Sequence, residues 1–255
     1  ESVELMSNHI YDFSPLASLP SLASLGLAVN RISSLEALPA FGDSLLALNV
    51  SYNLISDITP LSEANSLQSL NLNDNNNIAD LASLSGLTGL RELSVSRNNF
   101  HDLSPLSAMT GLQALAADGN SVADLTPLAS LTQLTSLSLS SSNVTDIGTL
   151  ATLTHLQTLS LMDDNINHVD SLAGLTKLVE LQVQGNNIVD FTPLTELDSI
   201  RTLGISNNVN ASTLAFLAGY TRLQILYAVN TDLTNIDPLE NLPELHELYL
   251  DINHI

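Results

Sequence analysis

A single spacing, repeated along the whole chain, constrains the fold more than any other feature of the sequence. The pattern L-x-x-L-x-L-x-x-N recurs in steps of 22 residues, three of which lengthen to 23. Such a period means that stacked copies share one continuous core. A partial copy from Val3 to Asn8 precedes the full ones, so we expect twelve strands. The eleven full copies start at Leu22, Leu45, Leu67, Leu90, Leu112, Leu134, Leu156, Leu178, Ile200, Leu223 and Leu245.

Each part of the repeat has a physical interpretation. The L-x-L portion has a period of two and predicts a strand with its leucines turned inward. The asparagine after it turns the chain, and its buried amide can bond backbone groups that would otherwise lack partners. Ser142, Asp164 and Thr231 replace it in three copies, and each is short and can accept a backbone bond. The asparagines are Asn30, Asn53, Asn98, Asn120, Asn186 and Asn208.

A second motif, D-x-S/T-P-L, marks the return half of the repeat. We expect its aspartate to cap the return segment and its proline to fix φ. Because the motif returns at one spacing, we interpret it as scaffold and not as a catalytic site. Twenty-two residues are too few for a strand, two turns and a full α-helix, so we expect 3₁₀ or extended structure here. The copies begin at Asp12, Asp57, Asp102, Asp124 and Asp190, with degenerate forms at Asp80 and Asp146.

Together these motifs predict an α/β solenoid over residues 1–255 as one domain. We expect a right-handed arc, with a parallel sheet on the concave face and 3₁₀ or extended segments on the convex face. Extra residues fall within 38–45, 74–80 and 207–214. The chain starts inside a strand and stops soon after the last one. Because solenoids need caps, we expect a fragment of a longer surface protein, with a further domain packed on Leu248 and Leu250.

Charge and cysteine content narrow the function. The chain has 27 acidic residues against 6 Lys plus Arg, a formal net charge of −21. This excludes nucleic-acid binding and disfavours an anionic membrane surface, whereas a basic partner, a cation or a salty environment is compatible. The absence of cysteine removes disulfides, thiol catalysis and Cys-based zinc sites. No apolar run approaches the ~18 residues that cross a bilayer, so we expect no membrane insertion.

The repeat L-x-L-x-x-N-x-I-x-D-I-x-P-L resembles the leucine-rich repeat of bacterial internalins over essentially the whole chain. The resemblance implies a secreted or surface-exposed bacterial adhesin that binds a host protein with its concave face. Intracellular regulators of protein phosphatases share the 22-residue period, but they typically lack the recurrent Asp-x-Ser/Thr-Pro-Leu.

The third, fifth, seventh and eighth residues of each repeat define the predicted concave face. Tyr227 and Tyr249 occupy the same position in adjacent repeats, so their rings should stack about one strand spacing apart. Exposed tyrosines are typical of interface hot spots, although these could instead pack beneath a missing domain. The serines in mid-face, such as Ser96 and Ser140, either fit the curved sheet or form a shallow trough. The other predicted ligand-binding residues are Ile225, Val229, Ile252, Tyr52, Asp163, Met162, Arg97 and Asp118. Tyr52, Val29 and Met6 form a weaker apolar cluster.

We favour a binding module over an enzyme, because a solenoid offers no closed pocket for catalysis. The segment Asp163–Asp170 resembles the start of a calcium loop but lacks its glycine and its final glutamate, so we predict no metal site and no cofactor. The expected partner is a protein, bound by a monomer with flanking domains. The alternatives are a structural spacer in a large surface protein and a scaffold similar to the phosphatase regulators.

Overall fold

The structure is a computed structural model that describes residues 1–75, 77–209 and 211–255. Asn76 and Asn210, inside two of the three segments with extra residues, lie outside the described residues. The chain divides into two compact units, Glu1–Leu134 and Thr135–Ile255, hereafter unit 1 and unit 2. Within the described residues, no helix has the length and apolar character to cross a membrane.

Unit 1 is a parallel sheet whose strands pair in chain order. Paired residues of neighbouring strands are one repeat apart in sequence, as when Leu25 pairs with Leu48 and Leu48 with Leu70. This register aligns equivalent positions of successive repeats. The strands are β1 (Ser2–Glu4), β2 (Ser24–Gly26), β3 (Ala47–Asn49), β4 (Ser69–Asn71), β5 (Glu92–Ser94) and β6 (Ala114–Ala116).

Unit 2 repeats the same arrangement. Its strands are also parallel and in chain order, with Leu226 paired to Leu203 on one side and Leu248 on the other. The twelve predicted strands are confirmed. Those of unit 2 are β7 (Ser136–Ser138), β8 (Thr158–Ser160), β9 (Glu180–Gln182), β10 (Thr202–Gly204), β11 (Ile225–Tyr227) and β12 (Glu247–Tyr249).

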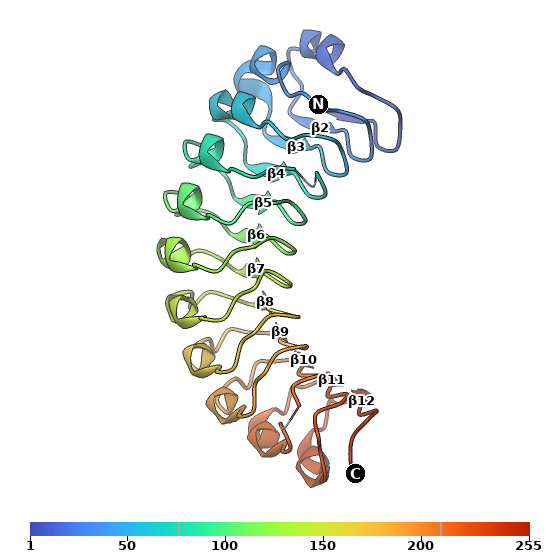
Figure 1. Cartoon of the computed structure of the whole chain (residues 1–255), viewed down its shortest axis with the longest axis vertical. Coiled ribbons are helices and arrows are strands. Elements are labelled where there is room, and N and C mark those ends of the chain that lie inside the picture. The colour runs from blue at the N-terminus through green and yellow to red at the C-terminus, as the bar shows by residue number, and fades with distance from the viewer. Residues whose placement is uncertain (76, 210) are drawn as a thin grey trace. The chain divides into compact units, whose positions relative to one another are not determined.

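Short 3₁₀ helices form the return half of the repeats, as predicted. Figure 1 shows each of them across its repeat from the strand. Unit 1 contains η1 (Ser14–Ser18), η2 (Leu38–Ser44), η3 (Thr59–Glu63), η4 (Ala82–Leu84), η5 (Ser104–Leu106) and η6 (Thr126–Ser130). Unit 2 contains η7 (Gly148–Thr152), η8 (Asp170–Leu172), η9 (Thr192–Leu194), η10 (Ala215–Gly219) and η11 (Asp237–Asn241). The extra residue within 38–45 is absorbed in η2, where Gly42 adopts φ 55°.

The core of each unit lies between its strands and its 3₁₀ helices. The fourth and sixth residues of the repeat point into it, as Leu93 and Val95 do in β5 and just beyond it, at 1% and 0% exposure. Burying one such side chain contributes about 1.5–3 kcal/mol. In unit 2 the core also holds Phe216 and the buried Tyr220, whose hydroxyl donates to the Leu194 carbonyl at 2.7 Å.

A ladder of asparagines follows the strands and confirms the predicted role of this position. The Asn53 amide donates to the carbonyls of Leu27, Val50 and Ser51, and its Oδ1 accepts the Ile32 N–H at 2.9 Å. Each rung therefore joins two repeats through backbone groups. The rungs in unit 1 are Asn30, Asn53, Asn75, Asn98 and Asn120, and those in unit 2 that keep asparagine are Asn186, Asn208 and Asn253.

Asp164 is the most unusual rung, because it buries a carboxyl group where other repeats bury an amide. Its Oδ1 accepts the N–H groups of Ser142 and Val144 at 2.9 and 3.0 Å, as predicted for a short acceptor. Its Oδ2, which occupies the place of the donating amide, is buried without a hydrogen-bond partner. Burial raises the pKa of Asp164. A carboxylate at this rung is therefore less favourable than an asparagine.

The two hydroxyl rungs behave differently. Ser142 donates to the Ser140 carbonyl and Thr231 to the Ala228 carbonyl. In these bonds the hydroxyls are donors, whereas the prediction concerned their ability to accept a backbone bond. The residue after each hydroxyl rung adopts a left-handed conformation, with φ of 63° at Asn143 and 59° at Asp232. A short side chain at the rung thus changes the turn that follows it.

The aspartate of the second motif caps the return segment, as expected, but from one residue before the helix N-cap. Asp57 Oδ1 accepts the Thr59 N–H at 2.8 Å and also the Thr59 hydroxyl. These two bonds, the hydroxyl first, lower the pKa of Asp57. Hydrogen bonds from the residue two positions on lower the pKa in the same way at Asp12, Asp102, Asp124 and Asp190.

Candidate binding surface

The open face of each unit is the side of the sheet that points away from the leucine core. It carries the third, fifth, seventh and eighth residues of the repeats, which is the face predicted to bind a ligand. The seventh position is partly scaffold. Ser96 and Ser140 are buried, and their hydroxyls accept the N–H groups of Asp118 and Met162 in the next repeat. Of the two interpretations of these serines, the structure supports the first, a fit to the sheet.

The eighth position adopts a left-handed backbone in every repeat. This conformation was not predicted, although Gly119 and Gly185 at this position are a sequence signal for it. The conformation is costly for β-branched residues such as Val29 and Ile252, with φ of 57° at each. Four predicted binding residues therefore lie on a tight turn and not on a strand. They are Tyr52, Arg97, Asp163 and Ile252.

The open face of unit 1 carries an Arg97 cluster, which consists of Tyr52, Asp74 and Arg97. The Arg97 guanidinium binds the Asp74 carboxylate through two bonds, at 2.5 Å from Nε and 2.6 Å from Nη2. Nη2 also donates to the Tyr52 hydroxyl at 3.0 Å, and Cζ lies 6.0 Å from the centre of the Tyr52 ring. Such a forked pair is among the strong polar contacts of proteins. The bond to Asp74 is the main cause that raises the pKa of Arg97.

The next repeat contributes two further features to this region. Gly119 in the next repeat leaves room for the Arg97 side chain, because a Cβ there would lie 3.1 Å from Arg97 Cγ. Asp118, also predicted as a binding residue, accepts a bond from the Ser96 hydroxyl at 3.0 Å. The Arg97–Asp74–Tyr52 and Ser96–Asp118 side chains are thus each bonded within unit 1.

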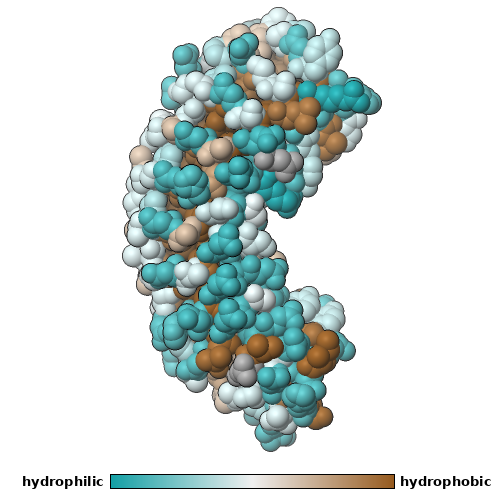
Figure 2. Space-filling view, in the orientation of Figure 1, coloured by the Kyte–Doolittle hydropathy of each residue, from teal (hydrophilic) through white to brown (hydrophobic). Residues whose placement is uncertain are grey.

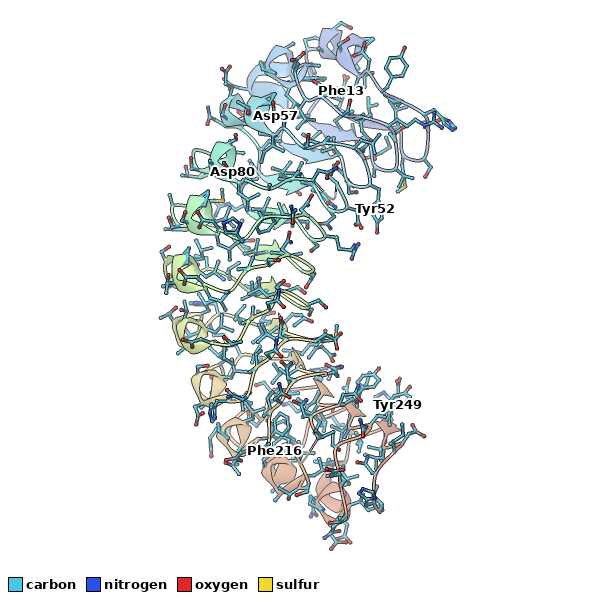
Figure 3. All side chains as sticks on the ribbon, in the orientation of Figure 1. Phe13, Tyr52, Asp57, Asp80, Phe216 and Tyr249 are labelled. Carbon is cyan, nitrogen blue, oxygen red and sulfur yellow. The ribbon has the colours of Figure 1, made fainter. Side chains whose placement is uncertain are left out.

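The open face of unit 2 carries the predicted tyrosine stack. Tyr227 and Tyr249 are paired in register on β11 and β12. Their ring centres lie 4.7 Å apart with an angle of 11° between the planes, which confirms the predicted stacking. Tyr249 is 41% exposed. Figure 3 shows Tyr249 on the side of unit 2 away from the core residue Phe216.

A carboxylate stands beside the stack. Glu247, two residues before Tyr249 on the same strand, accepts a bond from the Tyr249 hydroxyl at 3.3 Å. Its negative charge is the main cause that raises the pKa of Tyr249. We call Tyr227, Tyr249 and Glu247 the tyrosine face.

Aliphatic and acidic side chains surround the tyrosine face. Ile225 and Val229 are half-buried, while Ile252 is 75% exposed. Glu247 and Asp251 are exposed, and neither forms an ion pair with a described residue. Figure 2 shows apolar side chains interrupting a largely hydrophilic surface in both units.

A polar strip on β9 is separated from the tyrosine face by one strand, β10. Gln182 donates to Glu180 Oε1 at 3.0 Å, and Gln184 donates to Gln182 Oε1 at 2.6 Å. Gly204 on β10 pairs with Tyr227, and the space above it is taken by the two glutamines. The Glu180 carboxylate therefore accepts a bond from an amide of its own strand. Among the described residues, the Glu247 carboxylate accepts one only from the Tyr249 hydroxyl.

Met162 and Asp163 lie at the turn after β8, apart from the tyrosine face. Strands β9 and β10 separate them from Tyr227 in unit 2. The Asp163 carboxylate rests against Gly185 of the next repeat, where a side chain would collide with it. Ile225, Val229 and Ile252 thus lie in the same two repeats as the tyrosines, whereas this pair lies in another repeat.

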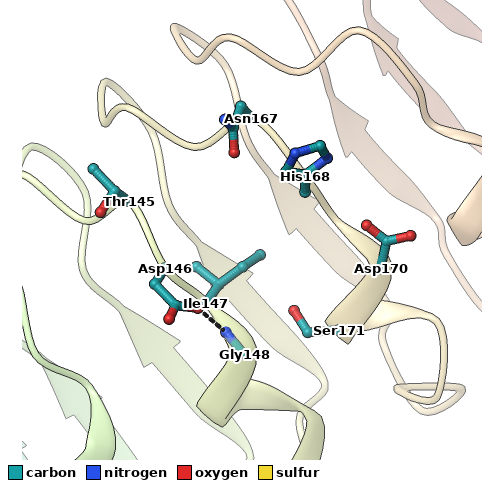
Figure 4. A pocket seen from close by; sticks show the side chains of 8 residues that line it. All are labelled: Thr145, Asp146, Ile147, Gly148, Asn167, His168, Asp170 and Ser171. Atoms are coloured by element: carbon teal, nitrogen blue, oxygen red, sulfur yellow. Dashed lines mark hydrogen bonds between the residues drawn. The ribbon is translucent and has the colours of Figure 1, made fainter.

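A groove of about 330 Å³ opens between two repeats of unit 2 (Figure 4). Asp146 Oδ1 accepts the Gly148 N–H at 2.8 Å on one side, and His168 and Asp170 lie on the other. His168 stands where the motif elsewhere has its aspartate, and Gly148 replaces its Ser or Thr. The groove includes part of the segment considered as a calcium loop, but no three potential ligands among the described residues cluster as a metal site. Its lining is Thr145, Asp146, Ile147, Gly148, Asn167, His168, Asp170 and Ser171.

The repeated strand and 3₁₀ helix define the class of the protein, a leucine-rich-repeat solenoid. The leucine rich repeat family profile matches residues 132–188. An internalin from Listeria monocytogenes, InlF, is 33% identical with a TM-score of 0.93, over 98% of this chain and 74% of that one. The chain belongs to the internalin family.

More distant structures share the fold. InlJ of Listeria monocytogenes, whose functional domain includes a cysteine ladder, is 24% identical with a TM-score of 0.85. The chain is covered to 99% and spans about half, 53%, of that protein. The ectodomain of an Arabidopsis thaliana receptor kinase, in complex with Casparian strip integrity factor 2, is 20% identical with a TM-score of 0.81, over 98% of this chain and 32% of that one. No curated protein sequence matched the chain.

Proposed function

We propose that the chain is the protein-binding module of a secreted or surface-exposed bacterial protein, and that the tyrosine face binds the ligand. One observation carries the proposal: Tyr227 and Tyr249 stack on the open face, and Tyr249 remains 41% exposed. Tyrosine supplies a large, stiff contact area with a polar tip, and it is enriched among the residues that dominate interface energies. The aliphatic residues Ile225, Val229 and Ile252 extend this area.

Several findings support a binding role. Membership of the internalin family favours an extracellular bacterial location. The plant receptor ectodomain, a similar fold at low identity, was solved with a bound factor. The buried serines of the open face bond the backbone, so they serve the scaffold and not a reaction. A non-enzymatic function is part of the proposal.

A parallel binding screen tests the proposal. The purified chain and its Tyr249→Ala variant would be screened against a panel of cell-surface protein ectodomains. Tyr11→Ala is the matched control, because Tyr11 is 78% exposed but lies outside the open-face positions. We expect an ectodomain that binds the chain and the control but loses binding to Tyr249→Ala. A spacer function predicts no such ectodomain, and equal losses in both variants would contradict the tyrosine face.

Location requires a separate measurement. Antibody labelling of intact bacteria that produce the protein should give the same signal before and after permeabilisation. A signal that appears only after permeabilisation would support the intracellular scaffold alternative.

A further inference from the structure

The charges around the tyrosine face are unbalanced. Glu247 and Asp251 are exposed carboxylates that form no ion pair with a described residue. None of the open-face positions in unit 2 carries Lys or Arg. A negative potential beside aromatic rings attracts cations, because the ring faces are themselves negative.

The Arg97 cluster of unit 1 shows how a tyrosine ring, its hydroxyl and a carboxylate together bind a cation. In the Arg97 cluster one guanidinium bonds a carboxylate through two atoms and a tyrosine hydroxyl through one, and lies over the tyrosine ring. The tyrosine face has the ring, the hydroxyl and the carboxylate, but it has no guanidinium. Its Glu247 and Tyr249 oxygens lie 3.3 Å apart, so a single donor group can reach both.

We infer that the tyrosine face binds an arginine side chain of a polypeptide partner, with the guanidinium between the Glu247 carboxylate and the Tyr227–Tyr249 rings. This inference rests on the proposed function, since it names the chemistry of the ligand at the same surface. Ile225 and Val229 would contact the aliphatic part of the same segment.

Arginine fits this site better than lysine. Its planar guanidinium can bond a carboxylate with two parallel N–H groups and stack on an aromatic ring at the same time. An ammonium group is a compact, strongly hydrated charge that uses the ring less well. The long-range field of a chain with a net charge of −21 attracts any basic segment. Discrimination between the two residues therefore has to come from the tyrosine face itself.

Random linear peptides displayed on phage provide the test. They would be selected on the immobilised chain at physiological salt and counter-selected on the Tyr249→Ala variant. The recovered peptides would then be synthesised with each arginine as arginine, lysine or citrulline, the neutral isostere. Affinities would be measured for the chain and for Glu247→Gln. Glu180→Gln is the matched control, because that carboxylate is on the same open face and already bonds Gln182.

We expect Tyr249-dependent peptides to be enriched in arginine. Replacing the critical arginine by citrulline should weaken binding about 10-fold, and Glu247→Gln about 5-fold, with Glu180→Gln unchanged. Lysine in place of arginine should also weaken binding. Tyr249-dependent peptides without arginine enrichment, equal binding of lysine, or equal losses in Glu247→Gln and Glu180→Gln would overturn this inference and leave the proposed function standing. Failure to recover any Tyr249-dependent peptide would overturn both.

Discussion

The Arg97 cluster of unit 1 and the tyrosine face of unit 2 both combine tyrosine with a carboxylate. They differ in whether the carboxylate is paired with a cation. In unit 1, Asp74 and the Tyr52 hydroxyl both bond Arg97. In unit 2, the Glu247 carboxylate has only the Tyr249 hydroxyl beside it. An exposed aromatic residue is therefore a better candidate when the charge beside it has no oppositely charged partner among the described residues. Exposure alone would have ranked Tyr52, at 51%, above Tyr249, at 41%.

The scaffolds beneath these clusters differ as well. The rungs of unit 1 are asparagines from Asn30 to Asn120, whereas unit 2 contains Ser142, Asp164 and Thr231 among its rungs. Unit 1, whose rungs from Asn30 to Asn120 are all asparagines, holds the Arg97 cluster. Unit 2, in which three rungs are other residues, holds the surface that we propose for binding.

The largest effect should come from removing the stacked rings. Tyr227→Ala with Tyr249→Ala should weaken binding of the selected arginine peptides by ~30-fold or more, since hot-spot residues contribute ~2 kcal/mol or more. Fluorescence anisotropy with a labelled peptide gives the affinity. Tyr52→Ala should change it little. An equal loss with Tyr52→Ala would break the distinction between the two clusters.

A change at the buried rung of unit 2 should be next in size. Asp164→Asn should raise the free energy of unfolding by about 1–2 kcal/mol at neutral pH, because it replaces an unpartnered buried oxygen by a donor. Urea unfolding measures this change. The reverse substitution at an intact rung, Asn186→Asp, should lower the free energy of unfolding. A lower urea midpoint for Asp164→Asn would show that the carboxyl group is better satisfied than its contacts indicate.

Removing the internal cation should have a smaller effect. Arg97→Ala should lower the free energy of unfolding by about 1 kcal/mol at most, because the side chain is 54% exposed and solvent screens its ion pair. Hydrogen exchange should speed up in unit 1 around Tyr52 and Asp74, and less so at high salt. A change confined to unit 2 would contradict the assignment of Arg97 to this cluster.

Acid should distinguish the units by the sign of the pKa shifts. Four aspartates with a lowered pKa lie in unit 1, and one, Asp190, lies in unit 2. A lowered folded pKa contributes stability above the unfolded value of about 3.9 that is lost as pH falls through the folded pKa. The raised pKa of Asp164 has the opposite effect. Its contribution to the stability of unit 2 increases as pH falls, because the folded state holds the proton more tightly.

Hydrogen exchange measured at about pH 5 and at about pH 3, on either side of the unfolded aspartate pKa, checks this expectation. Protection should fall more in unit 1 than in unit 2, and Asp164→Asn should narrow the difference between the units. A larger loss of protection in unit 2 would contradict the opposite effects expected from the lowered aspartate pKa values and the raised pKa of Asp164.

The sequence predicted most of the fold and the stacking of the two tyrosines, but not the Arg97 cluster. A fixed period of 22 residues determines the strand register, so the stack of Tyr227 on Tyr249 followed directly from their equivalent positions. The Arg97 cluster did not follow, because its three residues lie on left-handed turns whose side-chain directions depend on backbone geometry. The pattern also could not show that Ser96 is buried, since a hydroxyl suits either face of a curved sheet.

Tyrosine-selective NMR tests the central comparison directly, because the chain has only five tyrosines. The ring signals would be followed during titration with N-acetylarginine amide, in the chain and in Arg97→Ala. We predict shifts at Tyr227 and Tyr249 and none at the buried Tyr220 or at Tyr52. In Arg97→Ala the Tyr52 signal should begin to respond, because its cation site is vacated. Unchanged signals at Tyr227 and Tyr249, or an equal response of Tyr52 in the unmodified chain, would contradict the distinction between the two clusters.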